Sequence, residues 1–179
     1  MRYPVIEVLT ACLFILCFEI LGLSEELIKA LILTSFLIVI TYIDYDHQLI
    51  LDKILIWLAG VGVVINFYTH SLSALDMAVA SLVGGGILLI IALASRGGMG
   101  GGDIKFAAAL GLWFGLKITL LTLFFSFLLG GLGGILVLLF KLKSRKDLIP
   151  FGPFIAIAAY ISMLYGNMII DWYVKMYMR

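Results

Sequence analysis

Two groups of acidic residues stand where long apolar stretches end, and carboxylates in such places can perform acid–base chemistry. Asp44 and Asp46 close one apolar stretch, and Asp103 follows three glycines just before another. Ionisable groups at a membrane boundary are costly and often functional. Two carboxylates that two helices bring together can activate water, one as base and the other as acid. The sequence therefore predicts hydrolysis at a pair of aspartates.

Helical geometry separates the two aspartates of the first group. Asp44 and Asp46 point about 200° apart if the helix continues through them, at 3.6 residues per turn. Only one can then face a partner helix, and we predict Asp44, the deeper of the two, with Asp46 in support. His47 either biases the charge of Asp44 or is a solvated loop histidine. For Asp52, an N-cap of the next helix is favoured over a catalytic role.

The glycines before Asp103 allow two interpretations. Glycine backbone takes positive φ and approaches a ligand closely, so Gly100, Gly101 and Gly102 are candidates for supporting a substrate peptide beside the Asp103 carboxylate. The alternative is a flexible turn in which Asp103 caps the following helix. Lys105 lies on the opposite helical face from Asp103, so we predict a headgroup anchor that supports the site, not a charge partner of Asp103.

The first apolar stretch carries one acidic residue and both cysteines of the chain. Glu7 should face the bundle or a wet cavity, and we include it among the supporting residues with its role open. Cys12 and Cys17 are interpreted as small apolar side chains, because a disulfide or metal site within one span is unfavourable. No metal site is predicted.

The composition defines the protein class. Of 179 residues, 64% are hydrophobic and 13% are charged, whereas a soluble domain of this length needs far more polar surface. The sequence predicts an all-α, polytopic membrane bundle that forms a single domain over 1–179. At about 20 apolar residues per crossing, the predicted spans are 4–22, 26–43, 53–69, 74–95, 104–116, 117–140 and 151–172. The segment 104–116 is short, so six spans remain the alternative.

The distribution of Lys and Arg predicts the orientation, because cytoplasmic loops carry the excess of both. With seven spans, eight of the 12 basic residues fall on the side that holds the N-terminus and both acidic groups. These eight are Arg2, Lys53, Arg96, Lys105, Lys141, Lys143, Arg145 and Lys146. The N-terminus and the acidic groups are therefore predicted to be cytoplasmic.

Four segments together resemble a known family. Gly100–Asp103 matches the GxGD signature of intramembrane aspartyl proteases, and the following Ile-Lys is similar to its prepilin peptidase branch. The other matching segments are Arg2–Thr10, Ile43–Leu49 and Ile149–Phe154. The chain resembles a type IV prepilin leader peptidase. The resemblance implies that Asp44 and Asp103 are the catalytic aspartates.

The same resemblance implies a substrate and a location. The substrate would be a prepilin or pseudopilin N-terminus, a short basic leader followed by a hydrophobic helix, cut after the leader's terminal glycine at the cytoplasmic face of a prokaryotic inner membrane. Longer relatives carry a Cys-x-x-Cys region, which this sequence, as a short form with two cysteines, is expected to lack. Proteolysis requires no cofactor, and S-adenosylmethionine would be needed only for the family's second activity, N-methylation.

Two other functions are compatible with acidic residues in a bundle. A small ion- or proton-coupled transporter would place Glu7, Asp44 and Asp103 along a path, usually near the bilayer midplane. A non-catalytic factor that binds pilins during assembly has no need of two aspartates. Both rank below the protease. No nucleic-acid partner is predicted, the lipid bilayer is an expected partner, and the sequence does not indicate the oligomeric state.

Overall fold

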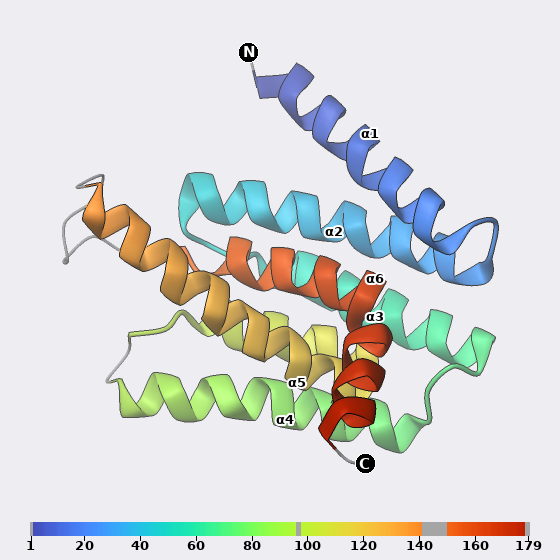
Figure 1. The fold of residues 1–179 in the computed structure, drawn as a ribbon. Coiled ribbons are helices and arrows are strands. Elements are labelled where there is room, and N and C mark those ends of the chain that lie inside the picture. Colours follow the sequence, from blue (N-terminus) through green and yellow to red (C-terminus); the bar gives the residue numbers. More distant parts are fainter. Residues whose placement is uncertain (1, 96–97, 141–149, 178–179) are drawn as a thin grey trace.

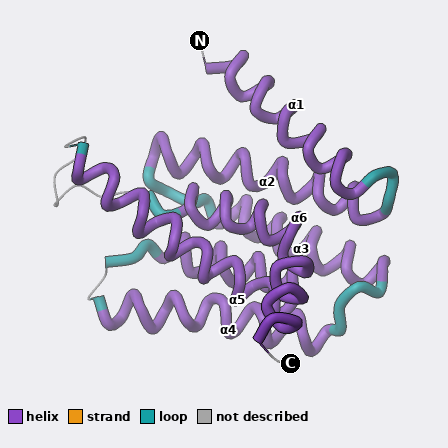
Figure 2. The backbone as a smooth tube through the Cα atoms, viewed as in Figure 1, coloured by secondary structure: helices purple, strands orange, loops and turns teal. Residues whose placement is uncertain are grey.

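A computed structural model describes residues 2–95, 98–140 and 150–177 of the chain. In these residues the regular structure is entirely helical, as Figure 2 shows. The described helices are α1 (Arg2–Leu21), α2 (Glu25–His47), α3 (Asp52–Thr69), α4 (Ala74–Ala94), α5 (Gly101–Leu139) and α6 (Gly152–Tyr177). All six are long and apolar enough to cross a membrane, so the predicted multi-pass helical membrane protein is confirmed.

The predicted fifth and sixth spans are two arms of α5, which breaks at Gly115 with φ 69° and ψ 176°. A side chain at Gly84 of α4 would lie 3.0 Å from both the Ala107 carbonyl and the Thr119 methyl group. In a straight helix, Ala107 and Thr119 would be about 18 Å apart at 1.5 Å per residue. The two arms therefore fold back along each other, and both open ends of α5 face the same edge of the bundle.

This edge, where α2 ends and α5 and α6 begin, is called the site edge below. The edge that contains Gly115 and the start of α4 is called the opposite edge. Figure 1 shows α2 to α6 packed in one bundle, with α1 lying across one side of it and tilted away toward its N-terminus. The short connections between consecutive helices alternate between the two edges, so α2 and α3 meet at the site edge.

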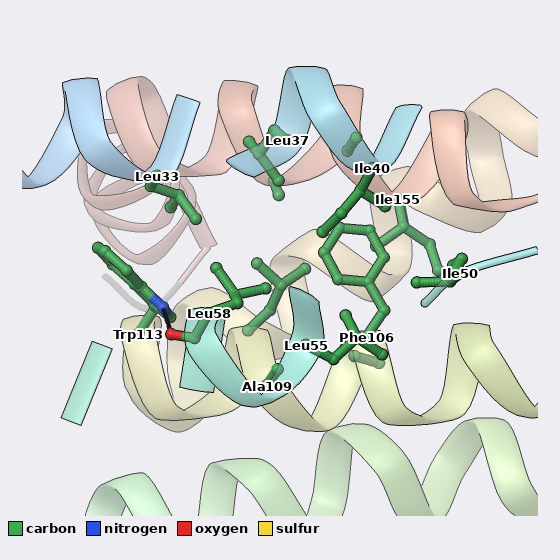
Figure 3. Packing of buried hydrophobic residues seen from close by; sticks show 14 of the residues in the cluster. Leu33, Leu37, Ile40, Ile50, Leu55, Leu58, Phe106, Ala109, Trp113 and Ile155 are labelled. Carbon is green, nitrogen blue, oxygen red and sulfur yellow. Dashed lines mark hydrogen bonds between the residues drawn. The ribbon is translucent and has the colours of Figure 1, made fainter. Parts of the chain in front are cut away.

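A large apolar cluster lies beneath the site edge (Figure 3). Phe106 of α5, Ile40 of α2 and Ile155 of α6 are all buried in it. Residues three or four apart lie on the same face of a helix. Phe106 therefore directs Asp103 toward the bundle interior, Ile40 does the same for Asp44, and Ile155 does so for Gly152.

Deeper in the bundle, polar backbone is satisfied by side chains. The Trp113 indole N–H donates to the Leu58 carbonyl at 2.7 Å, which joins α5 to α3. The Asn66 amide donates to the Leu112 and Trp113 carbonyls, just before the break in α5. Unsatisfied carbonyls in hydrocarbon are costly, so these bonds stabilise the end of the first arm.

Candidate active site

Two carboxylates from different helices meet at the site edge. Asp44 lies in the last turn of α2 and is 5% exposed, and Asp103 lies in the first turn of α5 and is 8% exposed. They are close enough for their charges to interact. Sequence positions 59 residues apart thus converge because Ile40 and Phe106 pack in one cluster, one turn below the two aspartates.

The backbone of α6 contacts Asp44. The Gly152 N–H donates a hydrogen bond of 3.0 Å to Asp44 Oδ2. A Cβ atom at Gly152 would lie 2.5 Å from the same oxygen, so only glycine allows the backbone to approach this closely. An N–H at the start of a helix is also one that has no partner within the helix, which makes it available to orient a carboxylate.

Only one of the two carboxylate oxygens of Asp103 has a hydrogen-bond partner among the described residues. The Gly100 N–H donates to its carboxylate, which ties Asp103 to the residue just before α5. Its Oδ1 atom is buried and has no hydrogen-bond partner among the described residues. Buried carboxylate oxygens are normally satisfied, so an unpartnered one beside a second carboxylate is a place where a water or a substrate group can bind.

Ile50 packs between the two parts of the site. It is 6% exposed, and a Cβ atom at Gly102 would lie 2.9 Å from Ile50 Cβ. A Cβ atom at Gly152 would lie 3.2 Å from Ile50 Cδ1. Nothing in the sequence pointed to Ile50. Gly152 was part of the Ile149–Phe154 segment that resembles the family, but its contact with Asp44 could not be predicted from that segment.

The prediction for the glycines before Asp103 is wrong in its backbone geometry. Gly101 and Gly102 already belong to the first turn of α5, and positive φ among the described glycines occurs at Gly22 and Gly115. Gly102 instead allows the close approach of Ile50. Gly101 is exposed, with open space around it. The alternative in which Asp103 caps the following helix differs only in position, because Asp103 is the third residue of α5 and its carboxylate accepts from the N–H of Gly100, just before the helix.

The structure corrects the expectations for Asp52 and Lys105. Leu51 occupies the N-cap position of α3 and makes no side-chain cap hydrogen bond. Asp52 is the first helical residue, and its carboxylate pairs with Lys105 Nζ at 2.7 Å on an exposed surface. Lys105 is thus a charge partner, of Asp52 and not of Asp103, and it joins the starts of α3 and α5.

Two further predicted residues lie outside the buried pair. Asp46 is exposed at the end of α2, as the helical geometry of Asp44 and Asp46 requires. Glu7 is exposed on α1 and does not face the bundle interior, which leaves the wet cavity as the prediction for this residue. The reason is that the N-terminal half of α1 tilts away from the bundle (Figure 1). Arg96, Lys141, Lys143, Arg145, Lys146 and Arg179, on which the orientation partly depends, lie outside the described residues.

Two nearly buried carboxylates can share a proton, since like charges a few ångströms apart disfavour double ionisation. The ionised member can accept a proton from water while the protonated one donates a hydrogen bond. In the described part of the chain, no three His, Cys, Asp or Glu side chains come together to hold a metal ion. Fold and site define a polytopic helical membrane protein with a paired-carboxylate site at one edge.

Comparison with known proteins narrows this class. Residues 31–135, which contain both aspartates, match the type IV leader peptidase family. Over 99% of its length the chain is 35% identical to a prepilin leader peptidase/N-methyltransferase of Legionella pneumophila. It is 36% identical over 97% to the protein of that name from Bacillus subtilis and 34% identical over 96% to the one from Aeromonas hydrophila. This chain belongs to the type IV leader peptidase family.

The similarity covers almost the whole chain but only part of each relative. The chain spans 63% of the Legionella protein, 70% of the Bacillus protein and 61% of the Aeromonas protein. No solved structure matches the fold.

Proposed function

We propose that this chain is an intramembrane aspartyl endopeptidase that removes the basic leader from type IV prepilins or pseudopilins, cutting after the leader's terminal glycine. The observation that carries the proposal is the convergence of Asp44 and Asp103, from α2 and α5, as nearly buried neighbours at one edge of a membrane bundle. Membership of the leader peptidase family supports the substrate class.

In this proposal the two carboxylates act together on water. The ionised aspartate takes a proton from a bound water, whose oxygen attacks the scissile carbonyl carbon. The protonated aspartate donates a hydrogen bond to the carbonyl oxygen and afterwards its proton to the leaving amine. Gly152 holds Asp44 through its N–H, and Gly100 holds Asp103. No covalent enzyme intermediate forms, and the pair returns to a single shared proton.

We further propose that the site edge is cytoplasmic, in a prokaryotic inner membrane, with the N-terminus on the same side. The described basic residues are evenly divided, with Arg2, Lys53 and Lys105 toward the site edge and Lys29, Lys117 and Lys175 toward the opposite edge, so they do not themselves decide the orientation. The positive-inside argument comes from the sequence. The whole of 1–179 is proposed to act as one integral-membrane peptidase domain.

Methyl transfer is not part of the proposal. The names of the relatives include an N-methyltransferase, an activity that requires S-adenosylmethionine. The cavity next to Asp52 and Lys105 measures about 410 Å³, and aliphatic side chains make up most of its lining. It has no aromatic side chain on which an adenine ring could stack. The described residues therefore do not fit the methyl donor at this cavity, and we derive no step through it.

The proposal is tested by cleavage of prepilin-type substrates in membranes. Wild type and Asp46→Asn should remove the leader, whereas Asp44→Asn and Asp103→Asn should not, with all four proteins inserted to equal levels. Activity in Asp44→Asn combined with inactivity in Asp46→Asn would keep the reaction class and reassign the first aspartate. A wild type that leaves several such substrates intact would contradict the proposal and favour a binding or transport role.

A further inference from the structure

The peptide bond between Phe151 and Gly152 is held at both of its polar groups. Its N–H, from Gly152, donates to Asp44 Oδ2 at 3.0 Å. Its carbonyl, from Phe151, accepts from the N–H groups of Phe154 and Ile155 at 3.0 and 3.2 Å, where α6 begins. The N–H and C=O of a trans peptide lie in one plane and point in opposite directions. Turning the N–H away from Asp44 would therefore also remove the acceptor of the first turn of α6.

The side chain of Phe151 is held by the second arm of α5. Its ring centroid lies 5.6 Å from that of Phe127 and 6.4 Å from that of Phe154, separations at which aromatic rings stabilise each other. A Cβ atom at Gly130 would lie 2.9 Å from Phe151 Cε2 and 3.3 Å from its Cδ2. The Phe151 ring thus lies directly against the backbone of α5, in space that a side chain at Gly130 would fill.

The glycines of the second arm differ in what lies against them. A Cβ atom at Gly133 would lie 2.6 Å from Phe154 Cε1. Gly130 and Gly133 are three residues apart and therefore share one face of the helix. At Gly131 and Gly134, nothing lies within 4 Å of a Cβ atom. Each glycine that contacts a ring of α6 is thus followed by one that has open space around it.

We propose that Phe151 is a positioning residue, through which the second arm of α5 fixes the direction in which the Gly152 N–H meets Asp44. The first arm of α5 carries Asp103 in its first turn. One helix thus positions both carboxylates, Asp103 directly and Asp44 through the start of α6. The inference rests on the proposed function and adds to it the way in which the paired site is assembled.

Phe154 supplies a comparison that separates positioning from packing. Its ring lies against Gly133 as closely as the Phe151 ring lies against Gly130. Phe154, however, follows Gly152 by two residues within α6, whereas Phe151 shares its peptide bond with Gly152. Displacing the Phe151 ring therefore moves the plane that carries the N–H, and displacing the Phe154 ring acts mainly on the packing of α5 against α6.

Nuclear magnetic resonance tests the positioning role without any cleavage assay. In protein labelled with nitrogen-15 glycine in detergent micelles, the Gly152 amide is the one of 19 glycine signals that Gly152→Ala removes. A hydrogen bond to a carboxylate moves an amide proton downfield, so Asp44→Ala should move this signal upfield. Gly130→Ala should move it in the same direction, Gly133→Ala should move it less, and Gly131→Ala should leave it in place. No response to Gly130→Ala, or an equal response to either of the other two glycine variants, would overturn the positioning role.

Kinetics test whether the effect passes through the ring. Gly130→Ala should lower kcat for leader cleavage about tenfold, less than the ~100-fold loss from moving a reacting group by about 1 Å, and should leave KM unchanged. Phe151→Ala should lower kcat to a similar extent. The double variant should lose no more than Phe151→Ala alone, since a Cβ atom at position 130 then has no ring to displace. Losses that multiply in the double variant would overturn the role of Phe151.

Two controls keep the outcomes separate. Thermal unfolding in micelles shows whether each variant is folded, and Phe151→Leu replaces Phe151→Ala if the latter is not. A wild type that leaves prepilin-type substrates intact contradicts the proposed function, whereas the Gly152 amide signal decides the positioning role in either case.

Discussion

Asp103 at the site edge and Asp76 at the opposite edge each lie beside a glycine, but the groups around the two carboxylates differ. At the site edge, Asp103 Oδ1 is buried and has no partner in the described part of the chain. At the opposite edge, Asp76 Oδ1 accepts a hydrogen bond of 3.2 Å from the Leu116 N–H. Its Oδ2 occupies the space that a side chain at Gly115 would need. Asp76 thus caps the second arm of α5, and its hydrogen-bonding capacity is used by the fold.

The comparison shows how the surroundings of the candidate catalytic carboxylate differ from those of a structural one. Aspartate and glycine at a helix start occur in both regions, so residue type does not separate them. Each carboxylate accepts one hydrogen bond from a backbone N–H, of Leu116 for Asp76 and of Gly100 for Asp103. What differs is the rest of the surroundings: a second carboxylate, Asp44, lies near Asp103, whose Oδ1 has no partner among the described residues. A third arrangement, Asp52 with Lys105, is exposed and contributes little, as surface ion pairs usually do.

The largest effect is expected from neutralising either member of the pair. Asp44→Asn or Asp103→Asn should lower kcat by about 100-fold or more, because positioned acid–base groups contribute at least that much. Asp76→Asn, at the opposite edge, should stay within a few-fold of wild type. Leader cleavage with purified protein measures all three. Comparable losses in Asp76→Asn and Asp103→Asn would remove the distinction between the two regions.

The next effect concerns the backbone that orients Asp44. Gly152→Ala would force a Cβ atom onto Asp44 Oδ2 and should lower kcat by about 100-fold, the loss typical of a reacting group displaced by about 1 Å. Gly60→Ala is the matched control, since nothing lies within 4 Å of a Cβ at that position. Full activity in Gly152→Ala, with the protein folded, would show that the Gly152 N–H does not position Asp44.

The corresponding glycine substitution at the opposite edge, Gly115→Ala, should lower the free energy of unfolding and not kcat. Gly115→Ala places a side chain at a positive φ and against Asp76, and we expect it to cost about 1–3 kcal/mol of unfolding free energy. Thermal unfolding in detergent micelles measures the cost, with Gly131→Ala as a control in open space. A loss of kcat without a loss of stability would mean that the break in α5 acts on the site directly.

The smallest effect is expected at the exposed ion pair. Asp52→Asn and Lys105→Gln should each lower stability by about 1 kcal/mol or less, and the double variant should be no worse than either single one. A double-mutant cycle of unfolding free energies checks this. A coupling well above that value would give the pair a larger part in holding the starts of α3 and α5 together.

Much of the site followed from local rules. The choice of Asp44 over Asp46 as the buried residue is confirmed, because helical geometry allows only one of them to face inward and the apolar flank of α2 defines which. The catalytic roles of Asp44 and Asp103 remain predictions. The prediction that Asp52 is an N-cap was wrong. A carboxylate at a helix start can either cap the helix or pair with a cation, and Asp52 pairs with Lys105, 53 residues away in the sequence.

The sequence by itself determined the class of the protein, the approximate helical spans and the family, because these depend on composition, local periodicity and short motifs. It left open whether 104–116 is a span of its own, and the break at Gly115 came from the structure. Only the tertiary structure decided which groups surround each carboxylate. Gly152 donates to Asp44 and Ile50 packs against Gly102 because Ile40, Phe106 and Ile155 bury one another. Such contacts join residues up to 108 positions apart, and packing in three dimensions, which no local pattern encodes, is what selects them.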